Sequence, residues 1–156
     1  MIIETYEERS PLVYDRSGDV HRFALFSPEL LDVPFDPRDV YFAETERKHR
    51  YGANKRLLKT PKIEIIPGAR PGTLAWVDWH WVAPSYVYID FMKVRSDWRA
   101  RGAGRQLVEA FYVHVIRANA VETVHWGRVM SPYAWKIYQH MQRLYPNVSH
   151  AGHVDF

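Results

Sequence analysis

The chain has 156 residues, a formal net charge of +3 and a hydrophobic content of 47%. This length and apolar fraction fit one globular domain over residues 1–156 and exclude a disordered chain. The absence of cysteine excludes disulfides, thiolate catalysis and thiolate metal sites. No apolar run is long enough to cross a membrane, so we expect a cytoplasmic protein without a membrane partner.

The first part of the chain predicts a strand pair and a polar helix. Residues 12–25 are typical of two strands around a turn at Gly18. Ser27 and Pro28 favour the start of a short helix, and residues 36–58 have a helical but polar pattern. Basic residues are concentrated over residues 48–59, which indicates either a solvated helical face or a contact with an acidic substrate or nucleic acid.

Three more strands are predicted over residues 61–66, 73–82 and 86–94. The last two are separated by a short turn, so we expect them to pair antiparallel. Alternation along residues 73–82 places Asp78 and His80 on one face, where they either face solvent or contact a substrate.

Asp90 is the one carboxylate in an aromatic strand. Alternation places it on the same face as Tyr86, Tyr88, Met92 and Val94. A buried carboxylate costs free energy unless it is paired or used. Asp90 is therefore either a general base or amine anchor, or the acceptor of a structural hydrogen bond.

A glycine loop between a strand and a helix follows directly. The loop runs from Arg99 to Gly104, and helical spacing of apolar residues begins after it. The first N–H groups of a helix lack intrahelical partners, and the helix dipole adds positive charge there. Glycines allow the backbone to approach an anion, and the arginines raise the potential, so the segment predicts a phosphate-binding loop. An ordinary turn with solvated arginines is the alternative.

Two common phosphate motifs do not fit this loop. Leu107 stands where a dinucleotide fingerprint needs its third glycine, and Arg105 stands where a P-loop has lysine. The loop instead matches R/Q-x-x-G-x-G/A through Arg99, Gly102 and Gly104. It thereby resembles the acyl-CoA motif of the GNAT superfamily of N-acetyltransferases.

The end of the chain predicts a β-α-β unit and carries a second resemblance. Residues 122–130 indicate a strand parallel to residues 86–94, and Ser131 with Pro132 predicts the start of a helix. Ser131, Ala134 and Tyr138 match the N-x-x-A-x-x-x-Y pattern common in that superfamily. Serine replaces the usual asparagine, and the Gly-Phe that often follows is missing.

The resemblance implies an α/β chain of the α+β type, with a mixed, mostly antiparallel sheet and helices on both faces. The sheet would open between the strands ending at Val94 and near Met130. Acetyl-CoA would be the cosubstrate. It implies contacts with coenzyme A from Met92, Val94, Arg99, Ala100, Arg101, Gly102, Ala103, Gly104, Arg105 and Ser131.

The resemblance also implies direct transfer of an acetyl group to an amine, with Tyr138 as the acid that protonates the thiolate. For the base we rank Asp90 before Asp78 and His80. The acceptor is a small molecule or a polypeptide; a nucleobase or a nucleic-acid partner stays open, and so does a homodimer. The alternatives are a catalytically inactive acyl-CoA-binding protein and a basic nucleic-acid-binding domain. No metal is expected, because His150 and His153 lack a third ligand.

Overall fold

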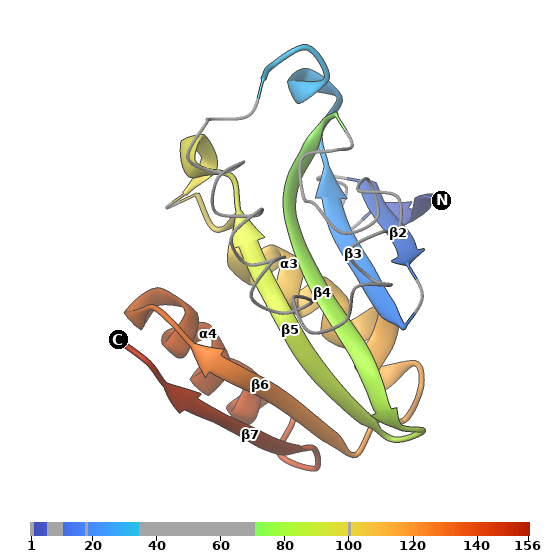
Figure 1. Cartoon of the computed structure of the whole chain (residues 1–156), viewed down its shortest axis with the longest axis vertical. Coiled ribbons are helices and arrows are strands. Elements are labelled where there is room, and N and C mark those ends of the chain that lie inside the picture. Colours follow the sequence, from blue (N-terminus) through green and yellow to red (C-terminus); the bar gives the residue numbers. More distant parts are fainter. Residues whose placement is uncertain (1, 6–10, 18, 35–70, 100) are drawn as a thin grey trace, which may run out of the picture.

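The computed structural model describes residues 2–5, 11–17, 19–34, 71–99 and 101–156. They form an α+β fold in which one seven-stranded sheet has the strand order β1 to β7 (Figure 1). The strands are β1 (Ile2–Thr5), β2 (Pro11–Ser17), β3 (Val20–Phe26), β4 (Thr73–Ala83), β5 (Tyr86–Val94), β6 (Thr123–Val129) and β7 (Ser149–Val154). The helices are α3 (Ala103–Phe111), which continues as π-helical turns η5 (Tyr112–Arg117), and α4 (Pro132–Leu144); short 3-10 turns are η2 (Pro28–Leu30) and η4 (Ser96–Trp98).

The sheet is mixed and mostly antiparallel, as predicted. From β1 to β5, each strand pairs antiparallel with the next one along the chain. The last two pairs, β5 with β6 and β6 with β7, are parallel. The parallel pairs follow from the crossover helices α3 and α4, because a parallel connection needs a segment that returns to the starting edge. The strands expected over residues 12–25, 73–82, 86–94 and 122–130 are confirmed. The predicted helix over 36–58 and strand over 61–66 lie outside the described residues.

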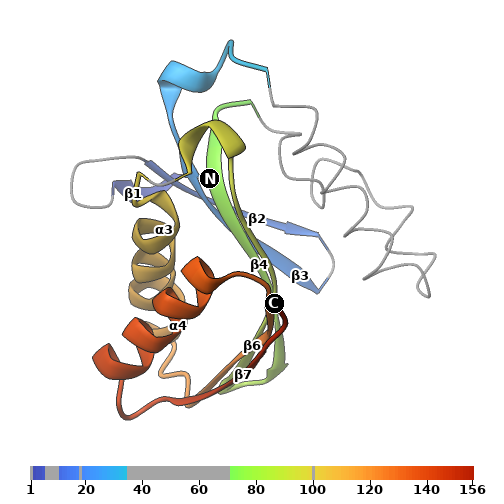
Figure 2. The ribbon, with the colours of Figure 1, turned by 90° about the vertical axis from the view of Figure 1, so that its left-hand side faces the viewer.

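Both α3 and α4 lie on the same face of the sheet (Figure 2). The expectation of helices on both faces is therefore not met by the helices that the structure describes. The main core fills the space between these helices and β3 to β6, with Phe23, Trp79, Leu107, Phe111 and Met141 among its members. None of the described helices has the length and hydropathy that a membrane crossing requires.

A β-bulge in β5 changes which side chains face the helices. Asp78 pairs with Phe91 and Trp79 with Ile89, so Asp90 is an extra residue in β5. Before the bulge, Ile89 packs in the core under the helices. After it, the side chains facing the helices are those of Met92 and Val94, whereas Phe91 packs with Ala24 and Trp76 in a separate cluster. The prediction that Tyr86, Tyr88, Asp90, Met92 and Val94 share one face was wrong, because alternation does not continue through a bulge.

A hydrogen-bond chain of two buried residues and the half-buried His150 ties β7 to the rest of the core. The indole of Trp126 donates to the Tyr112 hydroxyl at 2.9 Å, and Tyr112 lies 3.0 Å from Nε2 of His150. Nδ1 of His150 lies 3.0 Å from the Val148 carbonyl oxygen, so Nδ1 carries the proton and Nε2 accepts from Tyr112. Both ring nitrogens of His150 thus have hydrogen-bond partners within the protein, which is typical of a structural histidine.

The His150 network predicts a pH-dependent contribution to stability. Burial lowers the pKa of His150 below its usual value, and the bond to Val148 only partly opposes this. The unfolded chain therefore binds the proton first, and the contribution of His150 falls as the pH drops below about 6.5. His150→Gln keeps an acceptor for Tyr112 but cannot titrate. We expect its deficit in unfolding free energy against wild type to shrink between pH 7.5 and pH 5, as measured by urea unfolding.

Exposed His153 on β7 gives the matched control, His153→Gln. Its difference from wild type should change less with pH than that of His150→Gln. A deficit of His150→Gln that is the same at pH 7.5 and at pH 5 would contradict the assignment of a neutral, half-buried histidine.

Candidate functional site

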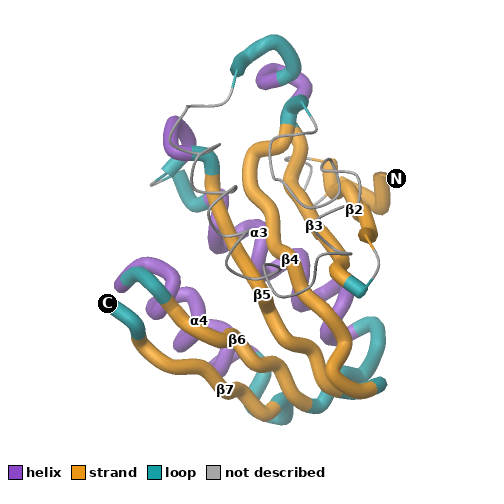
Figure 3. Tube along the Cα trace, viewed as in Figure 1, coloured by secondary structure: helices purple, strands orange, loops and turns teal. Residues whose placement is uncertain are grey.

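The sheet forks between β5 and β6. Their pairing runs from Tyr86↔Thr123 to Tyr88↔His125, and the structure describes no pair beyond it. Figures 1 and 3 show the two strands diverging toward their carboxyl ends. On the β6 side, Gly127 marks an irregularity of the strand: it has a φ of 61° and lies where the β6–β7 register shifts. Among the described strands, β6 is the neighbour of β5 on this side, and its pairing with β5 ends at Tyr88.

A cleft of about 610 Å³ lies beside this fork. It is formed by the end of β5, the loop after it, the first turn of α3 and the start of α4. Its lining is mostly apolar and consists of Met92, Lys93, Val94, Trp98, Arg99, Ala103, Gly104, Met130, Ser131, Tyr133, Ala134 and Ile137. This size and composition are typical of pockets that bind small molecules.

The two loop glycines have different roles. Gly102 is the N-cap of α3 with a φ of 79°, and a Cβ there would meet no heavy atom within 4 Å. As a glycine, this N-cap has no side chain that could accept a hydrogen bond from the first N–H groups of α3. A Cβ on Gly104 would instead lie 3.2 Å from the Tyr133 ring and 3.4 Å from Val94. Gly102 thus fits the predicted approach to an anion, whereas Gly104 mainly allows α3 to pack closely against α4.

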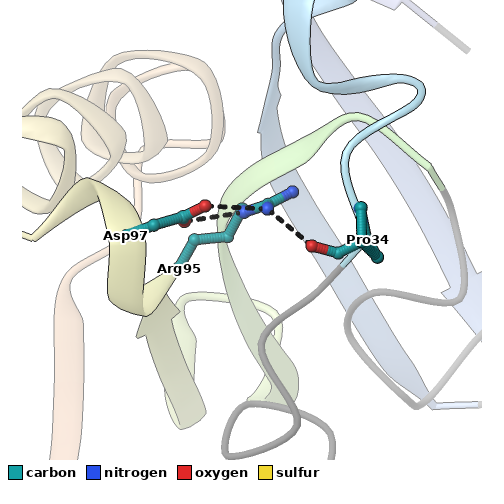
Figure 4. Close-up of polar contacts among 3 residues, drawn as sticks. All are labelled: Pro34, Arg95 and Asp97. Carbon is teal, nitrogen blue, oxygen red and sulfur yellow. Dashed lines mark hydrogen bonds and ion pairs between the residues drawn. The ribbon is translucent and has the colours of Figure 1, made fainter.

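Buried Arg95 fixes the loop that leads from β5 to α3. Its guanidinium donates to both carboxylate oxygens of Asp97 at 2.9 Å and to the Pro34 carbonyl oxygen at 3.1 Å (Figure 4). Bidentate pairing of this kind sets both distance and orientation. Asp97 lies in η4, so the contact holds the turn that places Trp98 and Arg99 in the wall of the cleft.

The predicted arginines separate into three environments. Arg99 is exposed and lines the cleft. Arg101 lies over the Trp98 ring at 4.8 Å from its centroid, a cation–π contact at the rim. Arg105 points away from the cleft, since it pairs with Glu109 at 2.7 Å and contacts His140 on α4 at 3.0 Å. Ala100, also predicted to contact the cofactor, lies outside the described residues.

Helix α4 begins as predicted. Ser131 is its N-cap, and the Ser131 hydroxyl accepts from the Ala134 N–H at 3.1 Å. Both residues line the cleft. Tyr138 does not: it is 4% exposed, and its ring stacks on Trp135 and packs edge-on against Trp126. Burial raises the pKa of Tyr138 above its usual value, so its hydroxyl stays protonated.

The three candidate bases lie on the other face of the sheet. Asp78 is fully buried and receives two hydrogen bonds from Arg22, at 2.7 and 2.9 Å. The alternative of a solvent-facing Asp78 is therefore wrong, and the ion pair gives this carboxylate a structural role. Nδ1 of His80 contacts Asp90 at 2.9 Å, so the other two candidates form a pair.

Several lining residues were not predicted. Lys93, Trp98, Met130, Tyr133 and Ile137 carry no motif, and only their proximity to the two matched segments could have indicated them. Conversely, three residues that were predicted to contact coenzyme A do not line the cleft: Arg101, Gly102 and Arg105.

No protein-family model, curated protein or solved structure matches this chain. The case for a function therefore depends on the residues and their geometry.

Proposed function

We propose that this protein is an acyl-CoA-dependent N-acyltransferase that moves an acetyl group from acetyl-CoA directly to an amine. The observation that carries the proposal is the combination of a forked sheet with an apolar cleft and a glycine loop at its end. Each part suits a different portion of one ligand. The end of β5 that diverges from β6 suits the amide groups of pantetheine, the apolar lining suits its alkyl segments, and the loop suits a pyrophosphate.

The residues that would hold the cosubstrate are those brought together at the cleft. The N–H groups at the start of α3 and the Arg99 guanidinium would bind phosphate oxygens. Backbone groups of Met92 and Val94 would bind the pantetheine arm, and Ser131, Ala134 and Ile137 would cover it from α4. Trp98 suits the flat surface of a base or an alkyl chain.

The reaction needs two proton movements. The amine nitrogen bonds to the thioester carbonyl carbon and gives up one proton, the C–S bond breaks, and the sulfur receives one proton. A backbone N–H near Val94 would stabilise the negative oxygen. Tyr138 would donate to the sulfur as the C–S bond breaks, since burial raises the pKa of this phenol and it keeps its proton until then.

A catalytically inactive acyl-CoA-binding protein is the second candidate. One observation favours it: the Tyr138 ring packs in the core and is absent from the lining of the cleft, whereas Tyr133 lines it. The basic segment over residues 48–59, on which the nucleic-acid alternative depended, lies outside the described residues.

Acetyl-CoA should raise the melting temperature of the wild-type protein. A ligand that binds only the folded state stabilises it by about 2.7 kcal/mol at a hundredfold excess over Kd. Arg99→Glu places a negative charge in the wall of the cleft, and we expect it to weaken binding at least tenfold. Thermal-shift titration with acetyl-CoA and with CoA measures both effects.

The matched control is Arg16→Glu, which makes the same charge change at an exposed position on β2, at the opposite side of the sheet. It should keep the wild-type response to the ligand. A wild-type protein that shows no shift at millimolar acetyl-CoA or CoA would overturn the proposed function.

A further inference from the structure

Among the described strands, β7 lies at one edge of the sheet. Its neighbour is β6, and Figure 1 shows β7 as the outermost strand on the side of the C-terminus. The N–H groups of Ser149 and Asp155 donate to backbone carbonyl oxygens on the β6 side, at 2.8 and 2.9 Å. Because backbone direction alternates along a strand, the N–H and C=O groups of His150, Gly152 and Val154 point to the outer edge. The described residues make no backbone hydrogen bond to these outward groups.

This alternation makes the outer edge of β7 complementary to a second copy of itself. In an antiparallel pair, two residues that exchange both hydrogen bonds must each direct their backbone groups to the other strand. A two-fold axis through Gly152 meets this condition, because it pairs Gly152 with Gly152 of the second copy and His150 with Val154. Ala151 and His153 then oppose each other in the pairs without hydrogen bonds.

The sequence of β7 lacks the features that keep edge strands from pairing. Such strands commonly carry lysine or another charged residue, proline or a bulge. The sequence of β7 is Ser-His-Ala-Gly-His-Val, without an acidic residue, lysine, arginine or proline. Where the β6–β7 register shifts, the extra residue lies on β6, since three residue steps on β6 oppose the two from Ala151 to His153. The outer edge of β7 is therefore regular and carries no permanent charge.

Exposed apolar side chains at the end of β7 suit the same pairing. Val154 and Phe156 are 44% and 60% exposed. In the register described above, Phe156 lies opposite Val148 of the second copy, a residue that packs against the main core. Asp155 lies opposite Ser149 and not opposite Asp155 of the second copy, so the pairing brings no like charges face to face. The pairing would thus cover apolar surface of both copies without electrostatic repulsion between them.

We infer that β7 pairs antiparallel with β7 of a second copy, so that the two sheets join into one across a two-fold axis at Gly152. Directly opposed residues of such a pair share a face. The helices of both copies therefore lie on one face, the face that Gly152 shares with the Tyr138 ring. The pairing does not depend on the proposed function, since no residue that lines the cleft belongs to β7. An edge of six residues buries less than the about 800 Å² per partner of a standard interface, so we expect a dimer that dissociates in the micromolar range.

Sedimentation velocity of the wild-type protein, from about 1 to about 200 μM, tests the pairing. We expect the average mass to rise from that of one chain toward that of two. Val154→Lys places a charge on the outer edge of β7 and should raise the dissociation constant at least tenfold. The matched control is Val33→Lys, at a position 40% exposed in the segment after η2, which lies far from β7 in Figure 1. It should keep the wild-type dissociation constant, and thermal unfolding at the lowest concentration checks that both variants are folded.

Introduced cysteines test the register, since the chain has no cysteine of its own. Ala151→Cys and His153→Cys proteins are mixed, with oxidised glutathione as the oxidant. Residues opposed in a pair without hydrogen bonds have Cα atoms about 4.5 Å apart, within the range that a disulfide spans. The mixture should therefore form a disulfide-linked dimer at least tenfold faster than either protein alone.

Three results would contradict the inference. A wild type that stays monomeric at the highest concentration would overturn it and would leave the edge of β7 to a strand of another protein. A dimer that Val154→Lys does not weaken would place the contact on another surface. A dimer that links the mixed cysteine proteins no faster than either protein alone would overturn the register through Gly152 and with it the two-fold pairing of β7.

Discussion

Asp78→Ala is expected to lower the free energy of unfolding by about 3–5 kcal/mol, because it leaves the Arg22 guanidinium buried without its bidentate partner. The two side chains are 0% and 6% exposed, and they join β4 to β3 at a directly paired position. Uncompensated burial of a cation costs far more than the loss of an exposed pair. Urea unfolding measures the change, and a loss below about 1 kcal/mol would show that Arg22 finds other compensation.

A double variant separates the effect of the two charges on stability from the effect of the volume that the two side chains occupy. Arg22→Met together with Asp78→Leu removes both charges and keeps apolar volume, so it should recover most of the stability that Asp78→Ala loses. The same variant tests the sequence-based ranking of Asp78 as a base. A structural pair predicts that the double variant, once folded, binds acetyl-CoA like wild type and releases its thiol at a comparable rate.

Tyr138→Phe is expected to lower the rate of thiol release about a hundredfold at saturating acetyl-CoA, if this hydroxyl supplies the proton to sulfur. The substitution keeps the ring and therefore its stacking on Trp135 at 4.8 Å and its contact with Trp126 at 5.3 Å. Stability and the acetyl-CoA thermal shift should change little. A thiol reagent measures release of the CoA thiol, with a polyamine, an aromatic monoamine, an amino sugar, a lysine peptide or water alone as the acceptor; the chain has no cysteine that would react with the reagent.

Tyr133→Phe is the matched comparison, since Tyr133 lies on the same helix and lines the cleft. A rate that falls in Tyr133→Phe and not in Tyr138→Phe would assign the proton donor to Tyr133. Unchanged rates in both variants would show that neither tyrosine donates the proton to the sulfur. No release by wild type that nevertheless binds acetyl-CoA would favour the inactive acyl-CoA-binding protein.

Much of the described fold follows from local patterns. Alternating apolar residues, the turn at Gly18 and the cap at Ser131 indicated the strands and the start of α4, and the crossover helix indicated the parallel pair. Alternation gave no sign of the bulge at Asp90. A bulge depends on how two strands match in register, so the sequence of one strand does not reveal it.

The candidate site was predictable only in part, for the same reason. The loop and the N-cap were visible because glycine and serine have conformational roles that follow from their own chemistry. The pairing of His80 with Asp90 and of Asp78 with Arg22 joins residues 10 and 56 positions apart, and it depends on the register of three strands. Which partner each carboxylate has therefore required the tertiary structure.

The unit formed by β6, α4 and β7 joins the rest of the sheet through three residue pairs between β5 and β6. A molecule bound in the fork would contact both parts and would bridge them. Its binding energy would add directly to the resistance of this unit to local opening. On the proposed function this molecule is acyl-CoA, and the half-life of the protein against proteases that act on opened states would then follow the supply of acyl-CoA.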